Sequence, residues 1–174
     1  HHPIEMQNYI FDQIMTAGTE FDIKPFGIRA MDSMRLEKSY RLIPREMSIE
    51  YSAFESGLDR FIRFDKASNF IGKEALQDWH KNGFENAFIT LEVHDIHDAD
   101  ARGSEAIYKD GELVGRATSG GYGFRVEKSL ALGLVKPEVA IVGNTLEIEI
   151  LGHLYHATIL AESPYDPENV KLRE

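Results

Sequence analysis

Apolar residues recur with a helical period near the start of the chain. Within residues 5–18 they return at the spacing of one helix face, and Gly18 is suited to the C-cap of such a helix. The face consists of Met6, Ile10, Ile14 and Ala17. The pattern therefore predicts an amphipathic helix over residues 5–18.

A second helix is predicted from Gly27 to Arg41, and it carries unusual charge for an element that should be buried. At 100° per residue, its polar side chains gather on one stripe and its apolar side chains on another. The polar stripe holds Arg29, Ser33, Glu37 and Tyr40, and the apolar stripe holds Ile28, Met31 and Met34. Because burial of unpaired charge is unfavourable, we expect the polar stripe to be paired internally, solvated or turned toward a ligand.

The pattern then changes from mixed to strand-like. Phe61, Ile62 and Phe64 suggest a short strand, and a helix follows from Phe70 through Trp79. Asn82-Gly83 is a C-cap signal that ends this helix. Beyond it, apolar and polar residues alternate, which is the period of a half-buried strand. We therefore place a domain boundary near residue 84, with mixed α/β structure before it and all-β structure after it.

Several short strands are predicted in residues 84–174. Asp110-Gly111 separates two apolar runs and is a strong hairpin signal. The other runs are 87–93, 130–135, 146–150 and 154–160, with Gly152-His153 turning the chain between the last two. Strands of this length and spacing are typical of a small barrel or a sandwich.

Composition narrows the classes of function. The chain has 174 residues, a formal net charge of −10 and no cysteine. The acidic balance argues against nucleic-acid binding, which needs a basic surface, and thiolate metal sites are excluded. No apolar run reaches the roughly 18 residues that cross a bilayer. We expect a soluble globular protein, or a piece of one.

Other chemistry-bearing stretches favour scaffold roles. His94–Asp100 is rich in ligand types, but His94 and His97 would point to opposite faces of an extended segment, so we predict a solvated loop and no metal. Ser119–Gly123 resembles a phosphate loop, yet it continues toward a strand instead of a helix. Glycines that let the backbone turn or bulge explain it better.

Glu37 remains the best candidate for a ligand contact. Arg29, Asp32 and Arg35 form i,i+3 pairs that satisfy one another, but Glu37 has no such partner on the helix. A carboxylate beside an aromatic such as Tyr40 suits a flat nitrogen heterocycle, because the carboxylate accepts two N–H bonds along one edge while the ring packs on apolar surface.

Four ordered motifs, which span nearly the whole chain, carry a resemblance to a known family. They are Phe26–Glu37, Phe54–Leu58, Phe70–Leu76 and the run Gly115–Gly123 with Lys128–Gly133. Together they resemble the glycine-cleavage T-protein (aminomethyltransferase) superfamily. The Arg-Leu-Glu-Lys form and the ending Tyr165–Asn169 look closest to the C-terminal folate-binding region of dimethylglycine and sarcosine dehydrogenase-like proteins.

The resemblance implies a tetrahydrofolate site. The family's pterin-binding glutamate falls on Glu37, and its basic contact after the Phe61–Phe64 stretch falls nearest to Lys66. Arg29 and Tyr40 are candidates for shaping the same pocket. The family's C-terminal aromatic falls near Val170, and Tyr165 is the aromatic residue that would replace it.

The resemblance also implies the architecture, which is α+β. Residues 1–83 would be the C-terminal portion of an α/β folate-binding domain, and residues 84–174 a C-terminal antiparallel β-barrel. The aspartate that orients folate in the family, and any FAD, would belong to an N-terminal part of a longer parent. The parent is then an enzyme, and this chain alone is inactive.

The implied activity is transfer of an amine-derived one-carbon unit to tetrahydrofolate, with an amine or an aminomethyl carrier as the other partner. The compartment would be the bacterial cytoplasm or the mitochondrial matrix. Two alternatives stay open. One is a non-catalytic folate-binding protein of the same superfamily, and the other is a structural module that docks a flavoprotein.

Overall fold

The computed structural model describes all residues, 1–174, as two compact units, His1–Met31 and Asp32–Glu174. The first unit contains the short 3-10 helix η1 (Ile4–Met6), α1 (Gln7–Ala17) and the 3-10 helix η2 (Thr19–Phe21). Gly18 ends α1 by donating its N–H to the Ile14 carbonyl, which confirms the predicted C-cap. No residue of α1 is buried, although its sequence is amphipathic.

The charged helix, α2, is shorter than the sequence predicts and less buried. It runs from Ile28 to Glu37, and only its last turn, Arg35–Glu37, is buried. Ser39 adopts a φ of 53°, which is the left-handed region, so the helix ends before Tyr40. Tyr40 therefore does not continue the helical stripe that holds Glu37, and this part of the prediction is wrong.

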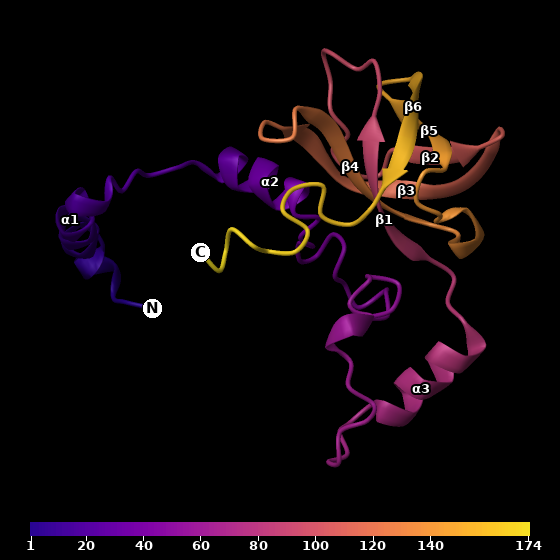
Figure 1. Cartoon of the computed structure of the whole chain (residues 1–174), viewed down its shortest axis with the longest axis horizontal. Helices are drawn as coiled ribbons and strands as arrows, with labels where there is room; N and C mark the ends of the chain where they lie inside the picture. Colours follow the sequence, from indigo (N-terminus) through magenta and orange to yellow (C-terminus); the bar gives the residue numbers. More distant parts are fainter. The chain divides into compact units, whose positions relative to one another are not determined.

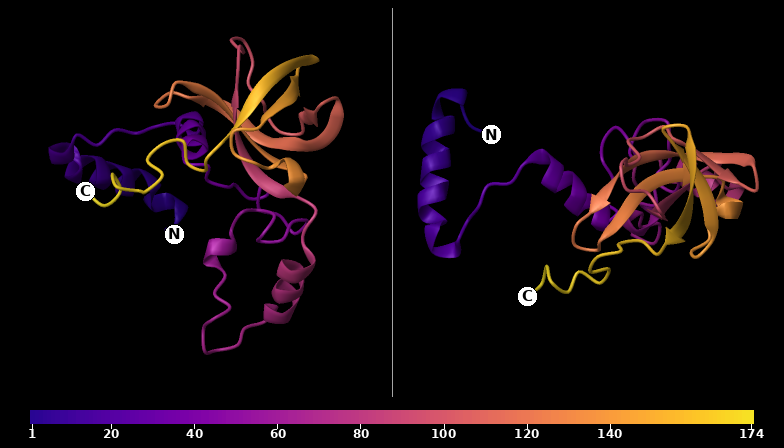
Figure 2. Two further views of the ribbon diagram at one scale, coloured as in Figure 1. Left: turned by 45° about the vertical axis from the view of Figure 1, so that its right-hand side comes forward. Right: turned by 90° about the horizontal axis from the view of Figure 1, so that it is seen from above.

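The segment between α2 and the barrel contains the 3-10 helix η3 (Asp59–Phe61) and α3 (Lys73–Asn82). The predicted helix over 70–82 is confirmed in position, with Gly83 at φ 87° after its last residue. The predicted strand at Phe61–Phe64 is wrong, since Phe61 closes η3 and no strand pairs with this stretch. Figure 1 and the left view of Figure 2 show α3 and the preceding loop extending away from the barrel.

Six antiparallel strands close into a barrel in the order β1-β4-β3-β2-β5-β6 (Figure 1). The sequence pattern was compatible with a barrel or a sandwich, and the structure shows the barrel. The predicted α+β class is confirmed. The strands are β1 (Ala87–Val93), β2 (Ala106–Lys109), β3 (Glu112–Gly123), β4 (Lys128–Val135), β5 (Thr145–Ile150) and β6 (His153–Leu160), with the 3-10 helix η4 (Pro137–Val139) before β5. The boundary near residue 84 falls just before β1 and stays a prediction.

Both predicted hairpins form, the first at Asp110-Gly111 as predicted and the second one residue earlier than Gly152-His153. Asp110 and Gly111 have φ of 52° and 81° between β2 and β3, which is the left-handed pair that a type I′ turn needs. Leu151 and Gly152, at 51° and 80°, turn β5 into β6 in the same way. Turn chemistry thus fixes the register of both hairpins.

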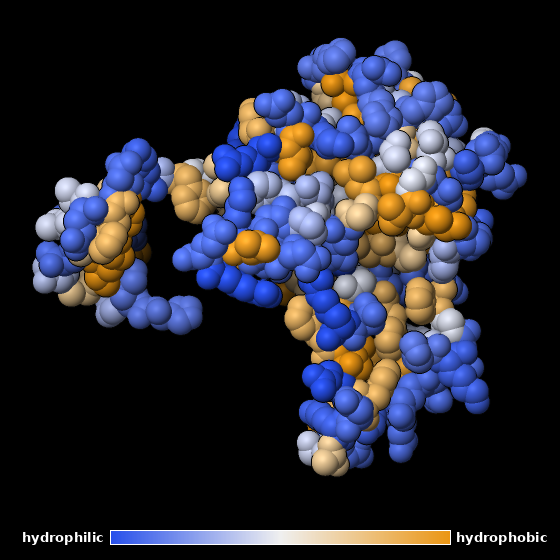
Figure 3. All heavy atoms as spheres, viewed as in Figure 1, coloured by the Kyte–Doolittle hydropathy of each residue, from blue (hydrophilic) through white to orange (hydrophobic).

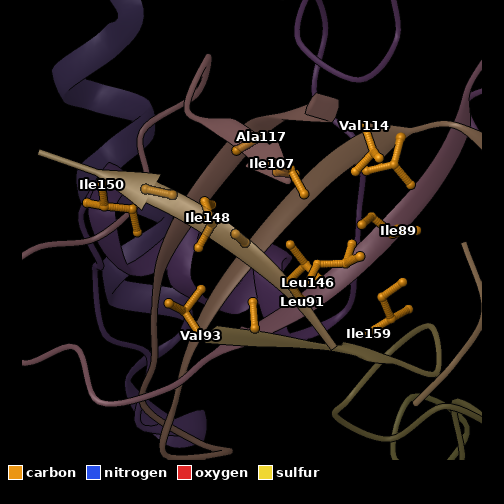
Figure 4. Packing of buried hydrophobic residues seen from close by; sticks show 14 residues of the cluster. Ile89, Leu91, Val93, Ile107, Val114, Ala117, Leu146, Ile148, Ile150 and Ile159 are labelled. Carbon is orange, nitrogen blue, oxygen red and sulfur yellow. The ribbon is translucent and has the colours of Figure 1, made fainter. Parts of the chain in front are cut away.

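The main core fills the barrel (Figure 4). Alternate residues of each strand point inward, and the labelled side chains meet in its interior; among them are Leu91, Ile107, Leu146, Ile148 and Ile159. A second cluster lies outside the barrel, where Leu36 of α2 packs with Leu130 and Leu132 of β4. The nearly unbroken apolar sequence of β4 is explained by this arrangement, because both of its faces are covered.

Candidate functional site

Glu37 has one carboxylate oxygen committed to the fold and one available. Its side chain is 4% exposed, and Oε1 accepts the backbone N–H groups of Arg125 (2.5 Å) and Val126 (3.3 Å). Oε2 makes no hydrogen bond within the chain, and since no fully buried side-chain oxygen lacks a partner, Oε2 is not fully buried. Glu37 thus holds the turn between β3 and β4 and keeps one carboxylate oxygen without a partner in the chain.

The glycine-rich end of β3 makes room for α2. A Cβ on Gly123 would lie 2.9 Å from Glu37 Cγ, and a Cβ on Gly121 would lie 3.2 Å from a Leu36 methyl carbon. These glycines are two apart in a strand and therefore face the same side. The segment is strand with a register shift between Ala117 and Ser119, which confirms the scaffold interpretation of its glycines.

Much of the charge on α2 is satisfied within the fold. Arg35 Nε donates to Asp32 Oδ1 at 2.8 Å, so one of the two predicted i,i+3 pairs is confirmed. Arg35 also lies 3.8 Å from Glu46, which is 0% exposed. The Glu46 carboxylate accepts the hydroxyls of Thr118 (2.6 Å) and Ser119 (2.5 Å) of β3. This buried network fixes the last turn of α2 against the barrel.

Tyr40 lies beside the end of α2, on the surface. Its side chain is 43% exposed, and it lines a hollow of about 680 Å³. The ammonium of Lys38 is 6.0 Å from its ring centroid. Tyr40 and Glu37 are therefore neighbours through the chain, although they do not share a helical stripe.

Arg29 and Lys66, the other two predicted site residues, are both exposed and lie in other segments of the chain. Arg29 is exposed in the first unit, in the first turn of α2. Lys66 is exposed in the loop before α3, with its ammonium 5.0 Å from the centroid of the Phe70 ring. Glu37 and Tyr40 are three residues apart in the chain, but Glu37 does not line the hollow that Tyr40 lines, and Lys66 belongs to another region. The ligand roles of all four residues stay predictions.

The C-terminal tail, residues 161–174, is a part of this region that the sequence did not reveal. It passes the end of α2 in Figure 1, and the backbone N–H of Tyr165 donates to the Glu37 carbonyl at 3.0 Å. Lys38 donates to the carbonyls of Tyr165 and Asp166 and to Asn169 Oδ1. No local signal marks Lys38, because its partners lie about 130 residues later in the chain.

Aromatic and cationic groups extend this region toward the β3–β4 turn. The Tyr165 ring has the Arg125 guanidinium 5.7 Å from its centroid and the Lys171 ammonium at 5.2 Å. Arg125 is also the residue whose N–H Glu37 accepts. Tyr165, which the resemblance offered as the tail aromatic, therefore lies near Glu37, whereas Val170 is only an exposed apolar residue.

The other chemistry-bearing stretches lie elsewhere. His94 shares a 2.8 Å hydrogen bond between its Nε2 and Thr158 Oγ1, next to the end of β1. No three His, Asp or Glu residues are grouped so that they could hold a metal ion. No helix is long and apolar enough to cross a bilayer.

Comparisons with known proteins identify the family. Residues 1–66 match the GCVT N-terminal domain, and residues 87–166 match the glycine cleavage T-protein C-terminal barrel domain. The chain is 37% identical to mitochondrial dimethylglycine dehydrogenase of Mus musculus over 93% of its length and 18% of that protein. It is 33% identical to an aminomethyltransferase of Desulfitobacterium hafniense over 91% of its length and 42% of that protein.

A solved structure shares the fold. The glycine cleavage system aminomethyltransferase T from Bartonella henselae superimposes with a TM-score of 0.82 at 19% identity, over 95% of this chain and 45% of that one. The chain therefore spans less than half the length of each of these relatives. With two consecutive family models covering most of its residues in the expected order, the chain belongs to the glycine-cleavage T-protein (aminomethyltransferase) superfamily.

Proposed function

We propose that this chain is the folate-binding portion of an enzyme that transfers an amine-derived one-carbon unit to tetrahydrofolate. The natural protein would be an aminomethyltransferase or a dimethylglycine dehydrogenase-like enzyme, and the product would be 5,10-methylenetetrahydrofolate. Its relatives include proteins named for both activities. The donor would be an amine or an aminomethyl group on a carrier.

The observation that supports this proposal is that the two carboxylate oxygens of Glu37 have different environments. Oε1 is held by two backbone N–H groups, which fixes the side chain in one orientation, while Oε2 has no partner in the chain. A fixed carboxylate oxygen without a partner accepts N–H bonds from the edge of a pterin without having to be ordered first. Tyr40 lies three residues further along the chain, and its ring would pack against the bound pterin.

The remaining assignments follow from the same proposal. Arg29 and Lys66 would contribute from other parts of the intact site, with Lys66 supplying charge without the planar fork of an arginine. In a dehydrogenase-like parent, FAD would be held outside residues 1–174. The compartment would be the bacterial cytoplasm or the mitochondrial matrix.

The proposal is tested by giving the natural full-length protein tetrahydrofolate with one of two classes of donor. The first is an aminomethylated carrier, whose carbon is already at the methylene level, and the second is a methylated amine together with an electron acceptor that takes the two electrons released when the methyl carbon is oxidised. We expect saturable binding of tetrahydrofolate and amine-dependent formation of 5,10-methylenetetrahydrofolate, followed by mass spectrometry. Omission of the amine is the control, because the folate alone carries no one-carbon unit to transfer.

Different results would support the alternatives. Folate binding without turnover by any amine would favour a non-catalytic folate-binding protein of the superfamily. Absence of folate binding together with tight association with a separate flavoprotein would favour a docking module, and it would overturn the proposed function.

A further inference from the structure

A polar hollow of about 310 Å³ lies where three segments of the second unit meet. The loop after α2, the loop between β1 and β2, and β3 each contribute one arginine to its lining. In that order, the arginines are Arg45, Arg102 and Arg116. Glu50 is the only acidic residue in the lining, so the lining carries a formal charge of +2. A basic hollow in a chain of net charge −10 favours an anionic ligand.

The three arginines of the hollow have no carboxylate partner. None of them takes part in an ion pair, whereas four other arginines of the chain do: Arg35, Arg41, Arg60 and Arg63. Hydrophilic residues cover much of the face seen in Figure 3, so exposed charge by itself does not mark a site. Three unpaired guanidinium groups around one hollow repel one another, however, and an anion bound between them relieves that repulsion.

Hydrogen bonds within the fold hold these arginines and their loops in place. Arg45 Nη1 donates to the Arg102 carbonyl at 3.4 Å, and Arg116 Nη2 donates to the Tyr51 hydroxyl. The Glu105 carboxylate accepts two consecutive backbone N–H groups, the first of them that of Arg102. Each guanidinium group has five N–H donors and uses at most one of them within the chain. Most of these donors are therefore free for a ligand.

A larger hollow with an apolar wall adjoins the polar one. It measures about 920 Å³ and shares Tyr51, Ser104 and Arg116 with the polar hollow. Its apolar wall includes Phe84 and Leu113, whose side chains are 37% and 58% exposed. A flat apolar group can pack there while an anionic group attached to it reaches the arginines.

These two hollows are separate from the proposed folate site. None of their lining residues bonds to Glu37 or lines the hollow beside Tyr40. Gly123, which packs against Glu37, lies roughly 20 Å further along β3 than Arg116, at about 3.3 Å per residue. An occupant of the two hollows is therefore a second ligand.

We propose that the polar hollow binds the phosphate group of a small phosphate ester whose flat apolar part lies in the adjoining hollow. A guanidinium group binds phosphate through two parallel hydrogen bonds, and three of them match the several oxygens of a phosphate better than the two of a carboxylate. Tyr51 places an aromatic ring where the two hollows meet. The Glu50 carboxylate opposes binding, because it repels the phosphate.

The test is titration calorimetry on the natural full-length protein with four small probes. They are phenyl phosphate, inorganic phosphate, phenol and benzoate, which separate the ring from the anion and phosphate from carboxylate. Arg102→Gln removes a guanidinium group that makes no hydrogen bond within the chain, so the fold should tolerate it. Glu50→Gln removes the opposing charge. Arg63→Gln is the matched control, because Arg63 is exposed, pairs with Asp65 and lines neither hollow.

We expect phenyl phosphate to bind more tightly than inorganic phosphate or benzoate, and phenol not to bind. Arg102→Gln should weaken phenyl phosphate by about tenfold, the size of one lost charge-assisted hydrogen bond. Glu50→Gln should tighten it, and Arg63→Gln should leave it unchanged. The affinity for tetrahydrofolate should be the same in wild type and Arg102→Gln.

Four results would overturn the inference. The first is no saturable binding of phenyl phosphate to wild type, and the second is equal affinity of wild type and Arg102→Gln for it. The third is benzoate binding as tight as that of phenyl phosphate, because the hollow would then not select phosphate. The fourth is an equal loss of tetrahydrofolate affinity in Arg102→Gln, since the arginine would then serve the folate site. A failure of the proposed function alone would leave this inference standing.

Discussion

At the scale of single residues, buried carboxylates organise the region around α2. Glu37, Glu46 and Glu55 are all buried and all accept several hydrogen bonds. The sequence singled out Glu37 because its helix offered it no partner. It did not single out Glu46, because the Thr118 and Ser119 hydroxyls that satisfy it lie more than 70 positions away. Long-range partners of this kind leave no local pattern.

Glu55 predicts how stability depends on pH. Burial alone would raise the pKa of its carboxyl, but hydrogen bonds from Ser52 and Asn86 outweigh burial and hold the pKa below its ordinary value of 4.5. A carboxyl with a lowered pKa in the folded state stabilises the fold above its ordinary pKa, and this stabilisation is lost as the pH falls below that value.

Denaturant titrations of wild type and Glu55→Gln check this. The stability difference between them should be full near about pH 6 and shrink as the pH falls through the ordinary pKa toward about pH 3. Asp98→Asn, at an exposed loop residue, is the control for removing a carboxylate that the fold does not bury. A Glu55→Gln difference that stays constant across this range would contradict the assignment.

At the scale of elements, local signals predicted most strands of the barrel but not the structure of the segment between α2 and the barrel. The hairpins at Asp110-Gly111 and Leu151-Gly152 follow turn chemistry, which is local. The strand expected at Phe61–Phe64 was wrong because strand propensity is realised only when a partner strand is available. Tyr40 was misplaced because nothing in the sequence distinguishes Ser39 as the left-handed residue that ends α2.

Packing of α2 on β3 makes a prediction about Gly123. A methyl group there would meet Glu37 Cγ and Val126 Cγ2, both at 2.9 Å, so Gly123→Ala should destabilise the protein by about 1–3 kcal/mol. Gly121→Ala is the comparison, because its added methyl would meet only the movable end of Leu36, at 3.2 Å. Denaturant melts should rank Gly123→Ala as the more damaging, and the reverse order would show that α2 is not packed as described.

At the scale of the whole molecule, the barrel acts as the platform that orders α2 and the tail. Its interior core is separate from the outer cluster of Leu36, Leu130 and Leu132, so α2 packs on the outside of the closed barrel. The sequence identified the barrel region and the family. The hydrogen bonds between the C-terminal tail and residues 37–39 became visible only in the structure. Around Glu37, the folate site that we propose therefore combines α2 with a tail from the other end of the second unit's sequence.

The central claim is that this assembly presents Glu37 to a pterin. Glu37→Gln is a sharp probe, since a glutamine oxygen still accepts the Arg125 and Val126 N–H groups while the oxygen without a partner becomes an NH₂ donor. Glu105→Gln is a control for the loss of a carboxylate that holds backbone N–H groups away from α2. It is the more disruptive change of the two, because Glu105 accepts the N–H groups of Arg102 and Gly103 with one oxygen each.

Titration calorimetry of tetrahydrofolate into the natural full-length protein tests the claim most directly. We predict that Glu37→Gln loses about 1.5–3 kcal/mol of binding free energy for each charge-assisted bond removed, while Glu105→Gln binds like wild type. Equal affinity of wild type and Glu37→Gln for tetrahydrofolate would contradict the account.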